Sequence, residues 1–360
     1  MTRLNRLRSR MAEEGVDLVA LAPGAHMAWL LGVTPHGDER PLLACITRDD
    51  AGFLMPALEA DSARQHTDLP FYSWNDADGP SEALEALLAE FNAGNAGNFV
   101  LDECMRADHA ALIQDRLLNA KRQFTESTVG ILRMCKDADE FEVLRRNAGT
   151  ADTAMQAVWS RMRAGMTETE VAQIVRDSFA AQNVKPLFWI IGARGNGAFP
   201  HHQTGESILR DGDAVVMDIG GTMEGYCSDI TRMAIIGSKP EGYDEIHAIV
   251  DAAVEAALAA AKPGVRAHVV DDAARKVITD AGYGEFFGHR TGHGLGTEVH
   301  EPPYITSASQ TVLQEGMVFS IEPGIYQPGR FGLRLEEIVI LHADGPEILS
   351  QLPRDPQIIG

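Results

Sequence analysis

Apolar runs that end in an acidic side chain recur in the second half of the chain, and they constrain its fold more than any other feature. Asp218, Glu322 and Glu336 each follow such a run. Short apolar runs of this kind are typical of buried strands. Because an ionised carboxylate among buried strands is unfavourable without a partner, the pattern predicts strands that hold acids in place for a cation or a shared proton.

A predicted hairpin brings a second acid to Asp218. The run Ala214–Met217 predicts a buried strand with Asp218 at its end, Gly220-Gly221 predicts the turn, and residues 225–232 predict the returning strand. Asp229 lies on this second strand, eleven residues beyond Asp218. A hairpin of this length can place the two carboxylates side by side. Taken alone, the pair is equally compatible with surface carboxylates or with a helix cap.

A histidine flanked by glycines completes a set of five donors. His293 lies in the segment TGHGLG at residues 291–296, where the glycines leave its imidazole sterically open. A lone histidine is more often structural, but two Asp, two Glu and one His together offer mostly hard oxygen ligands. Such a set suits two divalent cations, which can polarise a carbonyl and activate water. The predicted chemistry is amide hydrolysis.

Composition narrows the class of protein further. The chain has 360 residues, 45% hydrophobic and 23% charged, which is typical of a globular protein of about two domains. Its formal net charge of −21 repels phosphate backbones and anionic lipid surfaces, so we expect no nucleic-acid partner and no membrane partner. The same charge is compatible with cation binding, but most carboxylates must be ordinary surface groups.

The cysteines and the N-terminus indicate a location. The four cysteines are widely scattered, with no C-x-x-C pair, which argues against a zinc knuckle and a disulfide framework. Near the N-terminus, Glu13, Glu14 and Asp17 interrupt the apolar stretch that a signal peptide would need. No run approaches the 18 or more apolar residues of a membrane span. We therefore expect a cytoplasmic protein.

The chain divides into two regions that differ in their pattern of apolar residues. In residues 1–125, short apolar runs alternate with helical patterns, as in an α/β sheet domain. A polar segment follows, and a helix begins at about Ala138. Beyond it, Thr167-x-x-Glu170 predicts a capping box that opens a helix, and two further helices are predicted over 243–261 and 267–281. Each helical pair precedes a glycine-punctuated, strand-rich segment, so an internal duplication remains an open hypothesis.

The donors and their settings resemble a known family. The order Asp-x10-Asp, a histidine in G-H-G-x-G, I-E-P-G-x-Y and R-x-E-E is similar to that of the pita-bread metallopeptidases: prolidase, aminopeptidase P and methionine aminopeptidase. The first 125 residues resemble the creatinase-type N-terminal domain of the proline-specific members. The resemblance implies an α/β, RNase H-like domain at 1–125, a linker at 126–137 and an α+β pita-bread catalytic domain at 138–360.

The same resemblance implies roles for individual residues. Asp218 would chelate one metal, Asp229 and Glu336 would bridge both, and His293 and Glu322 would complete the other site. Glu322 would also act as general base. His201 and His300 match the two histidines on the substrate side of the family's site, whereas we expect a structural role for His202. Tyr226, Thr231 and Arg334 match motif positions that orient the ligands.

Departures from the family's patterns affect the expected substrate. All five ligands are present, unlike in creatinases, and Gly220 stands where the related dimethylsulfoniopropionate lyases carry an acid. After His300-Glu301 the chain lacks the arginine that strict prolidases use to hold a dipeptide's carboxylate. We therefore expect only a shallow preference for dipeptides, although Arg290 or Arg330 could supply the same contact from another direction.

The predicted function is hydrolysis of the bond between an N-terminal residue and proline, as in Xaa-Pro dipeptidases or Xaa-Pro aminopeptidases. Two alternatives remain open: hydrolysis of a non-peptide amide such as ectoine, and a pita-bread protein that binds partners without catalysis. The expected cofactors are two divalent metal ions, with Mn²⁺ first and Co²⁺, Zn²⁺ or Fe²⁺ as alternatives. The expected partners are short proline-containing peptides and a second copy of the chain in a homodimer.

Overall fold

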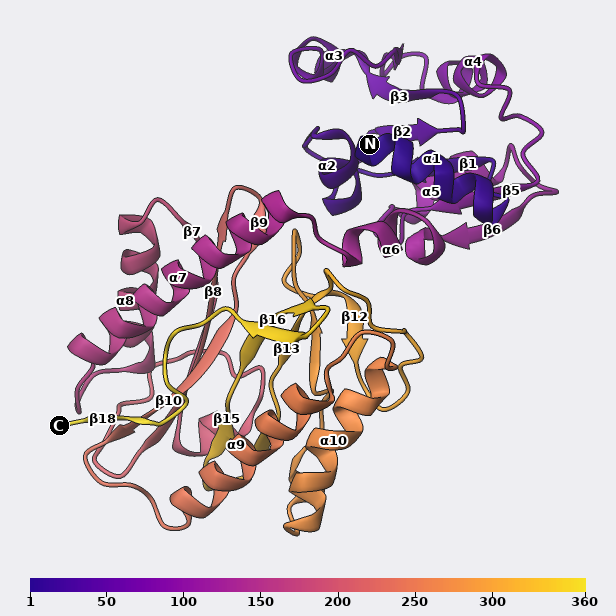
Figure 1. Cartoon of the computed structure of the whole chain (residues 1–360). Helices are drawn as coiled ribbons and strands as arrows, with labels where there is room; N and C mark the ends of the chain where they lie inside the picture. Colours follow the sequence, from indigo (N-terminus) through magenta and orange to yellow (C-terminus); the bar gives the residue numbers. More distant parts are fainter. The chain divides into compact units, whose positions relative to one another are not determined.

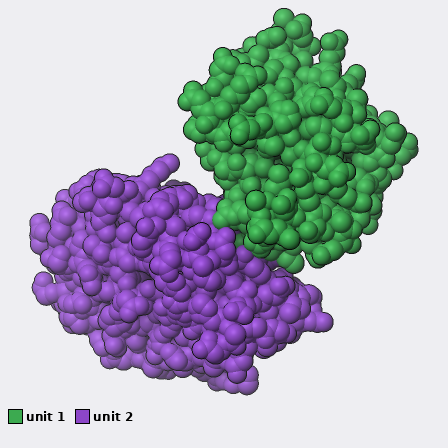
Figure 2. Space-filling model, turned by 45° about the horizontal axis from the view of Figure 1, so that its top comes forward, with its two compact units in different colours: residues 1–133 green, residues 134–360 purple.

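The computed structural model describes residues 1–360 and forms two compact units, residues 1–133 and 134–360, coloured separately in Figure 2. The division between Arg133 and Met134 falls inside the interval 126–137 that the sequence predicts as a linker. This interval is not extended, because it contains the whole of helix α6 (Val129–Met134). None of the helices in either unit has both the length and the apolar character needed to cross a membrane.

Unit 1 is built on one mixed sheet with the strand order β4-β3-β2-β1-β5-β6. Its side chains alternate between two apolar cores: Val19 and Leu21 of β1 pack into one, and Leu18 and Ala20 into the other. Both faces of the sheet are therefore covered. The elements of unit 1 are α1 (Arg3–Glu14), β1 (Leu18–Leu21), α2 (Ala25–Leu31), β2 (Leu43–Ile46), β3 (Ala51–Pro56), α3 (Ala57–Ala63), β4 (Phe71–Trp74), α4 (Ser81–Glu90), β5 (Asn98–Leu101), α5 (Ala107–Gln114), β6 (Lys121–Phe124) and α6.

Unit 2 contains two larger sheets, each accompanied by a pair of helices. One sheet has the order β18-β10-β8-β7, with β9 paired to β8, and the other has the order β12-β11-β13-β16-β17. Figure 1 shows α7 and α8 beside β7 and β8, and the orange pair α9 and α10 beside β13 and β12. The helices are α7 (Ala138–Arg161), α8 (Glu168–Ala181), α9 (Tyr243–Ala260) and α10 (Ala267–Asp280).

The strands of unit 2 range from two to ten residues, and capping boxes open two of its helices. The predicted capping box at Thr167 and Glu170 is present and opens α8, and Asp137 with Glu140 forms a second box that opens α7. The strands are β7 (Lys185–Ala193), β8 (Ala214–Met223), β9 (Tyr226–Cys227), β10 (Ile230–Ile236), β11 (Gly292–Gly294), β12 (Glu301–Ile305), β13 (Val318–Ile321), β14 (Gly324–Tyr326), β15 (Gly332–Arg334), β16 (Glu337–His342), β17 (Gly345–Ile348) and β18 (Gln357–Ile359).

The predicted turn at Gly220-Gly221 is wrong. Strand β8 continues through both glycines to Met223, and the chain reverses at Glu224-Gly225, where φ is +51° and +81°. Gly220 is required for close packing, because a Cβ there would lie 2.3 Å from both the Phe188 ring and the Ser228 carbonyl oxygen. Asp218 consequently lies in the middle of β8, not at its end.

Candidate metal centre

Five side chains from both sheets of unit 2 converge on one cavity. Asp218 lies on β8 and Asp229 lies between β9 and β10. From the second sheet, His293 lies on β11, Glu322 directly follows β13, and Glu336 connects β15 to β16. All five line a cavity of about 760 Å³. The predicted donors, which are far apart in the sequence, are thus brought together by the packing of the two sheets.

The distances between donors are those of a compact polar cluster. His293 Nε2 lies 3.2 Å from Glu322 Oε1 and 3.7 Å from Asp229 Oδ2. One donor atom each from Asp229, His293 and Glu336 lie within 4.8 Å of one another. A single cation of ordinary size can contact donors at this spacing, because typical bonds to oxygen or nitrogen measure about 2.0–2.2 Å.

Unpartnered oxygens show that the cluster fits a cation. Asp218 Oδ1, Asp229 Oδ1 and Glu336 Oε1 are buried and have no hydrogen-bond partner. Burial raises the pKa of Asp218, and burial together with neighbouring carboxylates raises the pKa of Asp229 and Glu336 well above the ordinary range. Buried acids that resist ionisation and lack partners are what cation binding would compensate.

An arginine and a threonine link Asp218 and Glu336 through hydrogen bonds. Arg334 donates from Nη2 to Asp218 Oδ2 at 2.6 Å and from Nε to Thr231 Oγ1 at 3.0 Å. Thr231 in turn donates from Oγ1 to Glu336 Oε2 at 2.8 Å. This chain of hydrogen bonds fixes the orientation of both carboxylates. The second oxygen of each acid takes no part in it and has no hydrogen-bond partner.

Two family models match this chain. Residues 142–343 match the model described as metallopeptidase family M24, and residues 3–135 match the creatinase/prolidase N-terminal domain. The chain belongs to metallopeptidase family M24. It is therefore a peptidase that uses divalent metal ions.

Full-length relatives agree with this family. The chain is 35% identical to a probable dipeptidase PepE of Mycobacterium tuberculosis, over 98% of this chain and 95% of the relative. It is 32% identical to an Xaa-Pro dipeptidase of Pyrococcus furiosus, over 98% and 99%. The crystal structure of dipeptidase PepE from Mycobacterium ulcerans superposes with a TM-score of 0.94 at 33% identity, covering 99% of this chain and 97% of that one. The creatinase-type and pita-bread folds inferred from the sequence are confirmed.

Both predicted substrate-side histidines line the cavity of this M24 peptidase. The rings of His300 and His293 lie edge to face, 4.2 Å apart between centroids. Burial, helped by the charges of His293 and Arg290, lowers the pKa of His300 to about 4, so its imidazole is neutral at pH 7. His201 enters the cavity from the loop that follows β7. Glu168, buried at the start of α8, holds that loop through His202 Nε2 at 2.8 Å.

Other residues named from the sequence are found at a distance from the donors. His202 pairs with Glu168 and does not line the cavity, as its structural role predicts. Tyr226 does not line it either, since its hydroxyl donates to Glu140 Oε1 at 2.7 Å. Tyr226 therefore braces β9 against α7, whereas Thr231 and Arg334 hydrogen-bond the candidate ligands Glu336 and Asp218.

Two polar residues at the site are not predicted from the sequence. The hydroxyl of Ser320 donates to Glu322 Oε1 and accepts from the backbone amide of His293, joining two candidate ligands across adjacent strands. His289 lines the cavity, with Nε2 2.8 Å from the Tyr326 hydroxyl. The only sequence signal is their position, because Ser320 precedes Glu322 by two residues and His289 precedes His293 by four.

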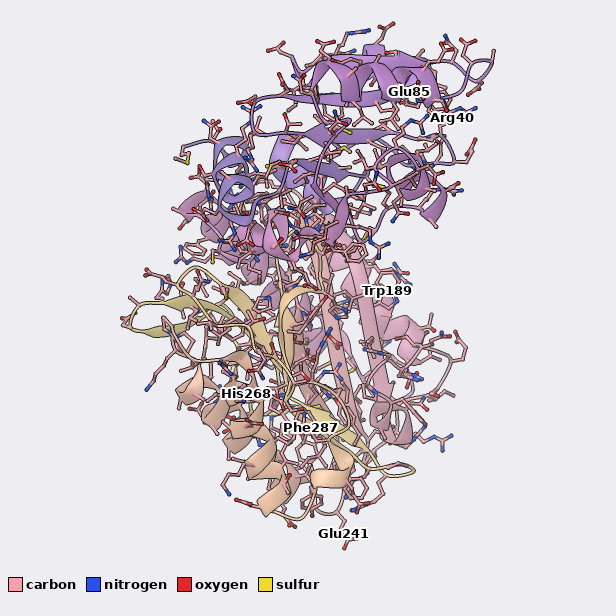
Figure 3. The ribbon with its side chains drawn as sticks, turned by 90° about the vertical axis from the view of Figure 1, so that its right-hand side faces the viewer. Arg40, Glu85, Trp189, Glu241, His268 and Phe287 are labelled. Atoms are coloured by element: carbon pink, nitrogen blue, oxygen red, sulfur yellow. The ribbon has the colours of Figure 1, made fainter.

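Arg290 and Arg330, the two arginines that the sequence offers as alternatives for contacting a dipeptide's carboxylate, have different surroundings. Arg290 lines the cavity, and its guanidinium lies over the Tyr304 ring, 4.7 Å from the centroid. Arg330 does not line it: its guanidinium donates to Gln327 Oε1 and to the backbone oxygen of Glu241, a residue on the rim of unit 2 in Figure 3.

Proposed function

We propose that this M24 peptidase hydrolyses the bond between an N-terminal residue and a following proline, using two divalent metal ions. The observation that carries the proposal is the set of five converging donors, three of which have a buried oxygen without a hydrogen-bond partner. Two further histidines line the same cavity. The relatives named as Xaa-Pro dipeptidases support the choice of bond. We infer that Asp218 holds one ion, that Asp229 and Glu336 hold both, and that His293 and Glu322 complete the other.

The chain's own groups supply the proton transfers. Bound ions would polarise the scissile carbonyl and lower the pKa of the attacking water. Glu322 would take the proton of that water and pass it to the leaving nitrogen. Burial opposes ionisation of Glu322, but the contact with His293 outweighs it and lowers its pKa to about 2, which keeps a base available. Ser320 holds Glu322 Oε1 in position during this transfer.

His201 and His300 would act on the substrate. A neutral imidazole can donate one hydrogen bond to the oxygen that gains charge during hydrolysis. The low pKa of His300 keeps this tautomeric, uncharged form at neutral pH. Apolar side chains make up the rest of the wall and would contact the side chain of the N-terminal residue or the proline ring: Leu187, Phe188, Ile190 and Val299.

Finer features are proposed on the same basis. We propose Mn²⁺ as the preferred ion because the set has four carboxylates and one imidazole, with Co²⁺, Zn²⁺ and Fe²⁺ as alternatives. We also propose a homodimer in the cytoplasm, with a functional division at 1–125, 126–137 and 138–360. The four cysteines are unpaired, which fits a reducing compartment. Neither ectoine-type amide hydrolysis nor a non-catalytic role is favoured, since the relatives are dipeptidases.

The decisive experiment measures turnover with each metal separately. The chelated protein would be loaded with Mn²⁺, Co²⁺ or Zn²⁺ and given Ala-Pro, Ala-Pro-Ala and the proline-free control Ala-Ala. We expect cleavage of the first two substrates, little cleavage of Ala-Ala, and no activity without metal. Failure to cleave any Xaa-Pro substrate with all three metals would rule out the proposed activity.

A further inference from the structure

A buried ion pair involves the residue that directly follows His300. Lys136 Nζ lies 2.6 Å from Glu301 Oε1, and the two side chains are 1% and 3% exposed. Glu301 is the first residue of β12. Neither Lys136 nor Glu301 lines the cavity, whereas His300 does. Any effect of the pair on a substrate in the cavity must therefore be transmitted through other residues.

The segment that carries His300 has no regular structure of its own. Residues 296–300, between β11 and β12, form neither helix nor strand, so their position depends on contacts with other elements. Glu301 supplies a contact at each of its oxygens. Oε1 accepts from Lys136, 165 residues away in the sequence, and Oε2 accepts from the backbone amide of Glu298 at 3.3 Å. Glu301 thus joins this segment to Lys136.

Lys136 is itself held in place, and the His300 segment packs tightly against the ion pair. The backbone amide of Lys136 donates to the Gly316 carbonyl oxygen at 2.8 Å. A Cβ added at Gly296 would lie 2.6 Å from Glu301 Oε1 and 2.9 Å from Lys136 Cε. The pair therefore has a fixed anchor on one side and the backbone of the segment in close contact on the other.

Stability alone does not explain a buried ion pair. The attraction between two buried charges is largely offset by the cost of removing them from water, and apolar residues of similar volume are often as stabilising. The pair does restrict the geometry, because either charge without its partner is strongly unfavourable in the interior. The geometry that is restricted here is that of the segment bearing His300.

We propose that the Lys136–Glu301 ion pair positions the His300 imidazole for catalysis. This inference rests on the Xaa-Pro activity proposed above and adds two positioning residues to it, both of which act through His300. The demand on geometry is strict, because a misplacement of about 1 Å can lower a rate about 10²-fold. The rings of His300 and the candidate ligand His293 lie only 4.2 Å apart between centroids, so a shift of the segment also moves His300 relative to the metal centre.

The main variant is Lys136→Met, which keeps the length of the side chain and removes its charge. We expect kcat for Ala-Pro to fall about 10- to 100-fold in the metal-loaded enzyme, the effect of misplacing one reacting group. KM and metal content should stay close to those of the unmodified enzyme, since neither member of the pair is among the five donors. Glu301→Gln should lower kcat less, because its amide oxygen can still accept from Lys136.

Gly296→Ala disturbs the same pair in an independent way. The added methyl group would displace Glu301 and Lys136 without removing either charge, and it should lower kcat as Lys136→Met does. Gly149→Ala in α7 is the matched control, because nothing outside its own helix backbone lies within 4 Å of that Cβ position. Arg145→Met is a second control, since it breaks an ion pair outside the cavity and should leave kcat unchanged.

A double-variant comparison tests whether the pair acts through His300. If it does, Lys136→Met should lower kcat in the unmodified chain and have no further effect in a His300→Ala background. Magnetic resonance of Zn²⁺-loaded protein with isotope-labelled histidine adds a readout without turnover. The His300 ring signal, identified by its absence from His300→Ala, should shift in Lys136→Met and keep its position in Arg145→Met.

The outcomes separate this inference from the proposed function. If Lys136→Met and Gly296→Ala keep a normal kcat, lose metal together with kcat, or lower kcat equally with and without His300, the positioning role is refuted while Xaa-Pro hydrolysis stands. If Lys136→Met does not fold, Glu301→Gln and Gly296→Ala decide by the same criteria. If the unmodified enzyme cleaves no Xaa-Pro substrate, the proposed function fails, and an unshifted His300 signal would then refute the positioning role on its own.

Discussion

Hydrogen bonds from neighbouring side chains orient the acids at the candidate metal centre of this M24 peptidase. Arg334 donates to one oxygen of Asp218, and Thr231 donates to one oxygen of Glu336, so the second oxygen of each acid is left without a hydrogen-bond partner. Asp229 has the most carboxylate neighbours, because the charges of Glu336, Asp218 and Glu322 all raise its pKa. The consequences for metal binding can be tested one residue at a time.

Replacing Asp229 with Ala should abolish metal binding and activity while leaving the fold intact. The side chain is the proposed bridging ligand, and the two large apolar cores of unit 1 and the core around α7, α8 and β8 do not include it. Elemental analysis, turnover and circular dichroism would check this. A variant that retained two metals per chain and unchanged turnover would show that the assignment is wrong.

Thr231→Val should lower metal affinity about 10- to 100-fold, the usual effect of removing a residue that orients a ligand. Valine keeps the shape of this buried side chain but cannot accept from Arg334 or donate to Glu336. Competition with a chelator would measure the loss. Thr222→Val on β8 is the matched control, since the Thr222 hydroxyl contacts only the sulfur of Cys227 at 3.9 Å, and it should bind metal normally.

His300→Ala should lower kcat about 10²- to 10³-fold, the effect of losing one donor to a developing oxyanion. Metal content should stay near normal, because His300 is not among the five donors. Measuring metal stoichiometry, melting temperature and kcat together separates this role from a structural one. A normal kcat, or a loss of stability without a kinetic defect, would contradict the proposed role.

At the scale of elements, sequence reasoning succeeded where strands are buried and failed where they are exposed. Short apolar runs in residues 1–125 coincide with β1, β2, β3 and β5, and α9 and α10 agree with the predicted ranges 243–261 and 267–281 to within one residue. Strands β4 and β6 were not predicted, because they are the two edges of their sheet and carry polar or half-exposed side chains.

Pairings between distant strands account for the remaining differences. Gly220 resembles a turn residue, but its small size serves contact with Phe188, a residue on the neighbouring strand β7. The five donors were predictable because their motifs are local. Ser320 and His289 were not, since their roles depend on hydrogen bonds to partners that only the sheet and the packing bring near.

An ion pair between α7 and β17 should make stability depend on pH. Arg145 donates to both oxygens of Glu347 at 2.7 and 2.8 Å, and together with His342 it lowers the pKa of Glu347 to about 2. A depressed folded-state pKa stabilises the protein above about pH 4.5, and this contribution disappears as pH falls toward 2.

Glu347→Gln should therefore lower the free energy of unfolding by about 1 kcal/mol at pH 7, a value reduced by partial solvent exposure. The difference from the unmodified protein should shrink as pH falls from about 4.5 to 2. Denaturant titrations at several pH values would measure it. Glu142→Gln removes the charge of the more exposed partner of Arg145 and is the control. If Glu347→Gln lowered the free energy of unfolding equally at every pH, the ion pair would not be the cause.

For the whole molecule, the division into two units predicts how metal affects unfolding. All five donors belong to unit 2, so a bound ion stabilises that unit directly. At a free metal concentration of 100 times Kd the gain is about 2.7 kcal/mol. Scanning calorimetry should show two transitions, of which only one shifts upward with added metal. Equal shifts of both transitions, or a single transition, would mean that the units unfold together.

The order of the donors along the chain also determines when the enzyme can first become active during its synthesis. Asp218 and Glu336 are separated by about a third of the 360 residues, and Glu336 is synthesised after all of unit 1 and after the other four donors. Domains fold in the order in which the ribosome delivers them, so unit 1 can be complete while the donor set is still unfinished. A nascent chain that ends before Glu336 therefore lacks one of the five candidate donors. The full set of candidate donors is therefore offered to metal ions only after Glu336 has been synthesised.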